Sequence, residues 1–282
     1  MRAALLVVIA YGVYGCTTTP VCVPGQVPHG EPGAPDPIAG YAIFSHAHND
    51  YEHARPLLDA LDAGFRSVEA DIYYAGGAFR VSHDGDSSKG TLEELYLAPL
   101  ELRVAANHGS VFGDGVPFRL VIDIKEARAE LPAALDALLA RYPMVSRRDD
   151  GAGDVTAGAV DVVFTGDDGM KRTLVAPSPR WGTRDSNSFS TSDPPGDERW
   201  TDYALAWPDY LAWDGDGEIP AEDLRQLECL VNDVHGSHRK LRMYATPDRK
   251  AVWAAELAAG VDYINTDDLA GLSRFLDAQP RQ

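Results

Sequence analysis

Two predicted strands carry acidic residues at alternating positions, an arrangement suited to binding a cation. The run SVEADIYY contains Glu69 and Asp71, and the run FRLVIDIK contains Asp123 and Lys125. Because side chains alternate between the faces of a strand, each pair shares one face of its strand. Three carboxylates on inward faces need a counter-charge that a single lysine does not supply. Since oxygen ligands favour hard cations over zinc, we predict one divalent cation, Mg²⁺ or Ca²⁺, at these carboxylates.

Histidines stand near this acidic set in the sequence. His48 lies in the run HAHNDY after the first predicted strand, and His83 lies in VSHD at the end of a hairpin strand. A neutral imidazole accepts a proton and a protonated one donates it, so two histidines beside a cation suit general acid–base catalysis. Together with Lys125 they indicate phosphoryl chemistry. His46 would share a face with His48 on a regular strand, so periodicity does not choose between them.

The elements that position these residues alternate along the chain between strand-like and helix-like periods. Strands are predicted at residues 41–46, 67–74, 78–84, 118–125, 159–166, 241–246 and 261–266, with 173–177 and 210–215 as candidates for two more. Helices are predicted at residues 56–64, 91–100, 127–142, 221–234, 247–259 and 268–278, and a long surface loop at 179–197. Repeated β-then-α units over residues 39–280 predict a single (β/α)8 TIM barrel, whose chemistry lies at the C-terminal ends of its strands.

Local signals mark the ends of two of these helices. Thr91 and Glu94 have the spacing of a capping box, in which each residue bonds the backbone of the other. Asp267 and Asp268 precede the last helix, and we expect both to cap it.

The ordered pattern HNDY, SVEADIYY, VSHD and VIDIK resembles the superfamily of glycerophosphodiester phosphodiesterases and phosphatidylinositol-specific phospholipases C. The resemblance implies a TIM barrel of the phospholipase C-like phosphodiesterase type. It also implies acid–base roles for His48 and His83, without saying which is the acid. The implied metal ligands are Asn49, Glu69, Asp71 and Asp123, and the implied phosphate-binding residue is Lys125.

One part of the superfamily pattern differs in this chain. The glycerophosphodiesterase sequence His-Arg-Gly followed by Pro-Glu-Asn is absent, and Asn49-Asp50 and Arg55-Pro56 stand near those places. We therefore predict a metal-dependent phosphoric diester hydrolase for a small-molecule or lipid substrate, either a glycerophosphodiester or a phosphoinositide-like diester. One alternative is a zinc amidohydrolase-like barrel, because His46-x-His48 begins such sites in other barrels. Another is a non-catalytic envelope lipoprotein that binds a phosphorylated ligand.

The first 38 residues have a different composition from the rest. Residues 1–16 combine a basic start, an apolar run of a dozen residues and Gly15-Cys16, and this run is shorter than the about 20 residues that span a bilayer. The layout resembles a bacterial lipoprotein signal with Cys16 as the lipidated residue. Residues 17–38 contain 6 Pro and 3 Gly, which predicts a tether. These features predict an exported protein anchored by lipid to a membrane of the bacterial cell envelope.

The charge of the chain excludes one class of partner. With 43 Asp and Glu against 25 Lys and Arg, the formal net charge is −18. Nucleic acid binds through basic surfaces that release counterions, so a nucleic-acid partner is not expected.

Overall fold

The computed structural model describes residues 45–151 and 154–279. Within these ranges, eight strands joined in parallel confirm the predicted barrel. Their spatial order is β10-β11-β12-β1-β2-β5-β8-β9, with every neighbouring pair parallel. The strands are β1 (Ser45–Ala47), β2 (Ser67–Ala75), β5 (Phe118–Ile124), β8 (Val160–Gly166), β9 (Thr183–Arg184), β10 (Asp202–Ala206), β11 (Lys240–Tyr244) and β12 (Tyr263–Thr266).

The two ends of this strand order meet and close the ring. Arg184 of β9 forms a parallel bridge with Trp200, two residues before β10. The amide of Arg184 donates to the carbonyl of Arg199 at 2.8 Å, and the amide of Ala204 donates to the carbonyl of Ser186 at 2.9 Å. The short strand β9 is therefore a strand of the barrel, with a neighbour on each side.

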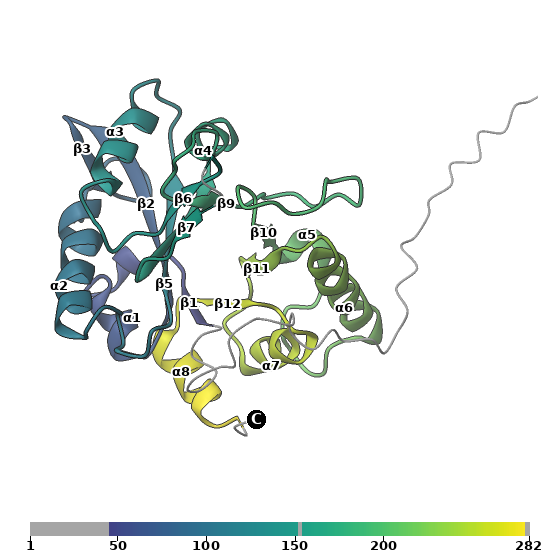
Figure 1. The fold of residues 1–282 in the computed structure, drawn as a ribbon. Helices are drawn as coiled ribbons and strands as arrows, with labels where there is room; N and C mark the ends of the chain where they lie inside the picture. The colour runs from purple at the N-terminus through teal and green to yellow at the C-terminus, as the bar shows by residue number, and fades with distance from the viewer. Residues whose placement is uncertain (1–44, 152–153, 280–282) are drawn as a thin grey trace, which may run out of the picture.

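Helices surround the ring, with α2 and α6 on opposite sides of it (Figure 1). They are α1 (Leu58–Asp62), α2 (Ala98–Ala106), α3 (Leu131–Leu139), α4 (Asp168–Val175), α5 (Trp207–Tyr210), α6 (Ala221–Gly236), α7 (Lys250–Ala259) and α8 (Leu269–Asp277). Shorter turns are the 3-10 turn η2 (Asp50–Glu52) and the π-helical turn η3 (Glu93–Leu97). A separate two-stranded ribbon joins β6 (Arg147–Asp149) to β7 (Asp154–Thr156).

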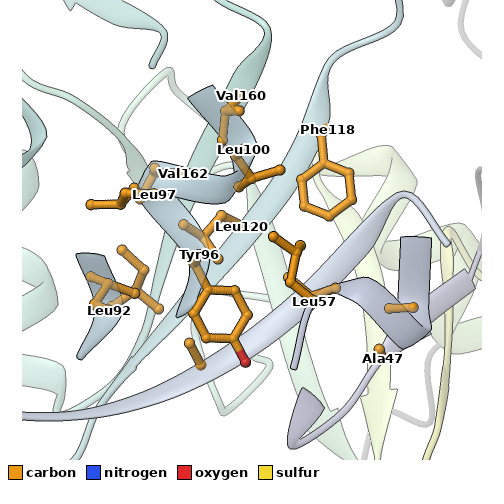
Figure 2. Packing of buried hydrophobic residues seen from close by; sticks show 14 of the residues in the cluster. Ala47, Leu57, Leu92, Tyr96, Leu97, Leu100, Phe118, Leu120, Val160 and Val162 are labelled. Atoms are coloured by element: carbon orange, nitrogen blue, oxygen red, sulfur yellow. The ribbon is translucent and has the colours of Figure 1, made fainter. Parts of the chain in front are cut away.

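Packing between strands and helices decides which side chains point into the barrel. Phe118 and Leu120 of β5 and Val160 and Val162 of β8 pack with Leu100 of α2 in the main core (Figure 2). Because strand side chains alternate, the odd-numbered position Asp123 must face the opposite way, into the barrel. The same alternation in β2 sends Val68, Ala70 and Ile72 into this core and leaves Glu69 and Asp71 facing inward.

A hairpin grows out of β2 and carries one of the predicted histidines. β3 (Ala78–Val81) pairs antiparallel with the end of β2, and Gly76 and Gly77 form the turn with φ of 62° and 80°. β3 then pairs with β4 (Gly90–Thr91), so His83 lies in the loop between these two strands. The capping box is confirmed, since Thr91 Oγ1 accepts from the amide of Glu94 at 3.1 Å and Glu94 Oε2 accepts from the amide of Thr91 at 3.1 Å.

Two of the strand predictions were wrong. Residues 173–177 belong largely to α4, which begins where Asp167 accepts from the amide of Met170 at 2.8 Å. Residues 210–215 are not a strand either, since Tyr210 ends the short helix α5 and residues 211–215 follow it without regular structure. The strands that fill these places are β9, inside the predicted loop at 179–197, and β10, a fully buried run that was not assigned.

The predicted leader at 1–16, tether at 17–38 and lipidated Cys16 lie outside the described residues. Within the described ranges, no helix combines the length and hydrophobicity needed to cross a membrane.

Candidate active site

Three carboxylates meet inside the barrel at the ends of two neighbouring strands. β2 and β5 pair in a register that sets Asp71 directly beside Asp123, and Glu69 lies two residues earlier on the same face of β2. One oxygen from each of the three carboxylates lies within 4.8 Å of the others. In the part of the chain that the structure describes, this is the one group of acidic, histidine or cysteine side chains with such spacing.

Two positively charged side chains contact the carboxylates, and only one of them was anticipated from the sequence. Lys125 Nζ lies 2.8 Å from both Asp71 Oδ2 and Asp123 Oδ2. Arg242 of β11 contributes the second, with its guanidinium Nη1 2.8 Å from Glu69 Oε2. Burial alone would raise the pKa of Glu69, but Arg242 and His46 outweigh it and hold that pKa well below its ordinary value. Burial and the neighbouring charges of Glu69 and Asp71 raise the pKa of Asp123 to about 6.

The carboxylates retain unused acceptor atoms. Asp71 Oδ1 and Asp123 Oδ1 are buried and accept no hydrogen bond from the described residues. Such a pair of oxygens is costly unless something positive approaches them. Gly166 of β8 has a φ of 85° and lets Asp123 Oδ1 lie close against its backbone, because a Cβ at this position would collide with that oxygen. The oxygen-only donor set and these two buried oxygens without a hydrogen bond fit a hard divalent cation.

His48 faces the carboxylates from the β1 side. Its Nδ1 lies 2.9 Å from Asp267 Oδ1, and its Nε2 lies 4.0 Å from Glu69 Oε1. Because an ionised carboxylate only accepts, Nδ1 donates to Asp267, and Nε2 is the nitrogen without a proton in the neutral ring. Burial opposes a charge on the ring, but the hydrogen bond to Asp267 and the charge of Glu69 raise the pKa of His48. The expectation that Asp267 caps the last helix was wrong, whereas Asp268 does cap it through the amide of Gly271 at 2.8 Å.

His83 approaches the carboxylates from the hairpin loop. Its Nδ1 lies 3.2 Å from Asp71 Oδ2 and 3.2 Å from the hydroxyl oxygen of Tyr51. Its side chain is 65% exposed, unlike the buried carboxylates beneath it. Asn49, the predicted fourth ligand, stands in the left-handed region at φ 46°, and its Oδ1 lies 2.9 Å from the Tyr51 hydroxyl.

His46 differs from His48 and His83 because its ring is buried and does not line the cavity. The side chain is fully buried, with Nε2 3.3 Å from Glu69 Oε2 and Nδ1 2.7 Å from the Ser67 hydroxyl. Burial and the nearby Arg242 lower the pKa of His46 to about 3. The ring is therefore neutral, donating from Nε2 to Glu69 and accepting from Ser67. His46 therefore stabilises the carboxylate of Glu69 through a hydrogen bond.

A cavity of about 310 Å³ brings these residues together. Its walls include the predicted residues His48, Asn49, Glu69, His83, Asp123 and Lys125, together with Arg242, Asn187 and Tyr244. One of these, Asn187, is held by a fully buried lysine, since Lys171 Nζ donates to Asn187 Oδ1 at 2.6 Å and to Asp185 Oδ1 at 3.0 Å. Tyr244 completes this side of the cavity.

Most of the residues that sequence reasoning missed come from the second half of the barrel. Arg242 and Asp267 carried no local motif, and only the even-numbered positions of the strand LRMYAT hinted that Arg242 and Tyr244 share a face. Asn187 lies in a segment that was predicted to be a surface loop. Tyr51 was part of the HNDY motif, but no role was assigned to it.

Two family profiles match parts of the chain. The AIM6-like phosphodiesterase domain matches residues 39–112, a range that contains His48, Glu69, Asp71 and His83. The glycerophosphoryl diester phosphodiesterase family matches residues 240–270, a range that contains Arg242 and Asp267. Both matches therefore fall on segments that build the cavity.

Individual proteins are similar over most of the chain. "Altered inheritance of mitochondria protein 6" of Kluyveromyces lactis is 25% identical over 82% of this chain and 71% of that protein. The protein of the same name from Eremothecium gossypii is 28% identical over 82% of this chain and 68% of that protein. A solved glycerophosphodiester phosphodiesterase from Agrobacterium tumefaciens has a TM-score of 0.48 and 17% identity, covering 81% of this chain and 97% of that chain.

These relatives correct the predicted location. The curated relatives with significant similarity are yeast proteins, so the prediction of a bacterial envelope lipoprotein was wrong. The comparisons likewise give no support to a lipoprotein signal. A short apolar run that ends at a cysteine is constrained only by hydrophobicity and by one residue, and this makes the pattern a weak indicator.

Proposed function

Since the chain belongs to the glycerophosphodiester phosphodiesterase-like superfamily, we propose that it is a metal-dependent phosphoric diester hydrolase. One observation carries this proposal. His48 and His83 line the same cavity and approach the carboxylate group from its two sides, one near Glu69 and the other against Asp71. A diester needs a proton removed from its nucleophile and a proton given to its leaving alcohol, and two separate imidazoles serve these needs.

Each residue of the cavity has a defined task in this proposal. Glu69, Asp71 and Asp123 would hold one cation, Mg²⁺ or Ca²⁺, with Asn49 as a further ligand. When bound, the cation would supply positive charge to a non-bridging phosphate oxygen. Lys125 stands beside the same carboxylates and would contact the phosphate.

The histidines would transfer the protons. One ring takes a proton from the attacking hydroxyl or water, and the other protonates the departing oxygen. An attacking hydroxyl within the substrate gives a cyclic phosphate, whereas water gives a monoester. Asn187, Arg242 and Tyr244 form the remaining wall and would contact the alcohol of a glycerophosphodiester or phosphoinositide-like substrate.

The zinc amidohydrolase alternative gains no support from the cavity. His46, which that alternative would use with His48, is directed to Glu69 and Ser67. The donor set found within residues 45–151 and 154–279 contains carboxylates alone, and such a set disfavours zinc.

The test is a panel of diesters incubated with the full chain. Glycerophosphodiesters, phosphatidylinositol and its deacylated form are followed by phosphorus NMR with Mg²⁺, with Ca²⁺ and with chelator. The double variant His48→Ala/His83→Ala, prepared in the same way, controls for contaminating enzymes. We expect cation-dependent cleavage in the wild type alone. Cleavage at equal rates in the double variant would refute the proposal, and binding of a diester without any turnover would favour a non-catalytic ligand-binding protein.

A further inference from the structure

The hydroxyl of Tyr51 occupies a central position beneath the cavity. Tyr51 lies in η2 and is fully buried. Its hydroxyl oxygen is 2.7 Å from Asp71 Oδ2, 2.9 Å from Asn49 Oδ1 and 3.2 Å from His83 Nδ1. One phenol thus contacts two proposed cation ligands and one of the two proton-transferring rings.

The phenol has a single proton, and this limits how its contacts divide. The carboxylate Asp71 Oδ2 is the nearest acceptor, and bonds to charged acceptors are the stronger ones. When the phenol donates its hydrogen bond to Asp71, the lone pairs of the phenol oxygen face His83 Nδ1. Nδ1 of His83 then faces two acceptor oxygens, from Tyr51 and Asp71, both at 3.2 Å. An Nδ1 without a proton would be repelled by both oxygens, so this geometry favours the tautomer with its proton on Nδ1 and leaves Nε2 to accept a proton.

The same contacts orient the carboxylate of Asp71. Its Oδ2 receives the Tyr51 hydroxyl at 2.7 Å and the Lys125 ammonium at 2.8 Å, while its Oδ1 is buried and accepts no bond from the described residues. Saturating one oxygen leaves the other available to a cation. His83 is mostly exposed and lies in a loop, and its ring contacts these two oxygens through Nδ1.

We propose that Tyr51 is a positioning residue, whose hydroxyl fixes the Nδ1–H tautomer of His83 and turns Asp71 Oδ1 toward the cation site. The effect on turnover depends on the proposed function, but the tautomer does not. The tautomer is therefore measured on chelator-treated protein without substrate.

The chain offers a matched control. Tyr96 is also fully buried, its hydroxyl donates to Asp50 Oδ2 at 2.9 Å, and neither of these two residues lines the cavity. Tyr51→Phe and Tyr96→Phe therefore each keep a buried ring and remove one phenol–carboxylate hydrogen bond. Thermal melting of both variants compares the structural cost of the two changes.

The first experiment is nitrogen-15 NMR of the histidine rings at a pH where imidazole is neutral. Loss of one signal in His83→Gln assigns the ring. We expect the Nδ1–H pattern for His83 in the wild type and in Tyr96→Phe, and a shift toward Nε2–H in Tyr51→Phe. The wild-type spectrum decides even if Tyr51→Phe does not fold, because an Nε2–H pattern there overturns the proposal.

The second experiment is steady-state kinetics on a diester that the wild type cleaves. Removing a group that orients a ligand or a proton carrier typically costs about 10- to 100-fold in activity, so kcat of Tyr51→Phe should fall by that factor with KM little changed. Tyr96→Phe should keep the wild-type kcat. An equal loss of kcat in both variants, or a wild-type tautomer and kcat in Tyr51→Phe, would show that Tyr51 is only a packing residue.

Discussion

Replacing the two histidines of the HAHNDY run should have different consequences, although only one residue separates them. His48→Ala removes a ring that lines the cavity and presents Nε2 toward Glu69. His46→Ala removes a ring that is fully buried and whose pKa is lowered to about 3 by burial and Arg242. A ring that stays neutral over the working pH range and has no contact with solvent is a poor proton carrier. We therefore expect His48→Ala to lose catalysis and His46→Ala to lose stability.

The magnitudes follow from these surroundings. Losing a general acid or base costs about 10²- to 10⁴-fold in rate, or about 3 to 5 kcal/mol of activation free energy. His46→Ala leaves Ser67 and Glu69 short of one bond each and opens a small void, which should lower the free energy of unfolding by about 2 to 4 kcal/mol. For a domain of this size, each 1 kcal/mol corresponds to about 2 to 4 °C in Tm.

The assay measures kcat on a cleaved diester and Tm for both variants, with Asp267→Asn as a graded control. Asp267 contacts His48 and is itself exposed, so its amide should reduce kcat less than His48→Ala does and leave Tm almost unchanged. If His46→Ala is inactive while fully folded and His48→Ala turns over normally, the assignment of the proton carrier is wrong by two residues.

Three further outcomes are expected. Asp123→Ala, or exhaustive chelation of the wild type, should abolish diester cleavage, and added Mg²⁺ or Ca²⁺ should restore only the chelated wild type; full turnover in the chelated wild type or in Asp123→Ala would contradict the cation site. Gly166→Ala should lower both Tm and cation affinity in calorimetry, because the φ of 85° strains an alanine and its Cβ would displace the Asp123 carboxylate; wild-type affinity would show that the close approach of Asp123 to Gly166 is not needed. Glu256 is fully buried, and its two carboxyl oxygens have no hydrogen-bond partner among the described residues. Burial raises the pKa of Glu256 well above its ordinary value, so folding retains a proton that the unfolded chain releases. The contribution of Glu256 to the free energy of unfolding should therefore fall as the pH rises above about 4.3, by up to about 1.4 kcal/mol per pH unit. In urea unfolding at several pH values, Glu256→Gln should remove this part of the decline, and an unchanged decline would show that Glu256 is not its source.

Local patterns predicted the barrel where they were long and regular. β5 and β8 are buried seven-residue strands, and α6 has the helical period over most of its length. β9 has only two residues, and no periodicity exists over two positions. It is a strand because it pairs with β8 on one side and forms a bridge to Trp200 on the other. The sequence 173–177 is apolar enough for a strand, but the cap at Asp167 starts a helix that extends into it.

The first half of the cavity was predictable for a related reason. Glu69, Asp71 and Asp123 lie on adjacent strands of known face, so alternation alone placed them together. Asp267 is 219 residues from its partner His48 in the chain, and no local rule connects them. Only closure of the barrel brings β12 beside β1, with Thr266 paired to Ala47.

The charge balance of the cavity still favours a divalent cation after Arg242, which the sequence argument did not include, is counted. The sequence argument set Lys125 alone against three carboxylates. Arg242 adds a second positive charge, and its pairing with Glu69 satisfies one of those carboxylates directly. The three carboxylates and the two positive side chains still sum to one negative charge, which would repel the single negative charge of a phosphodiester. A divalent cation changes that sign to a single positive charge, complementary to the diester, so the ion that the carboxylates need is also the one that the proposed substrate needs.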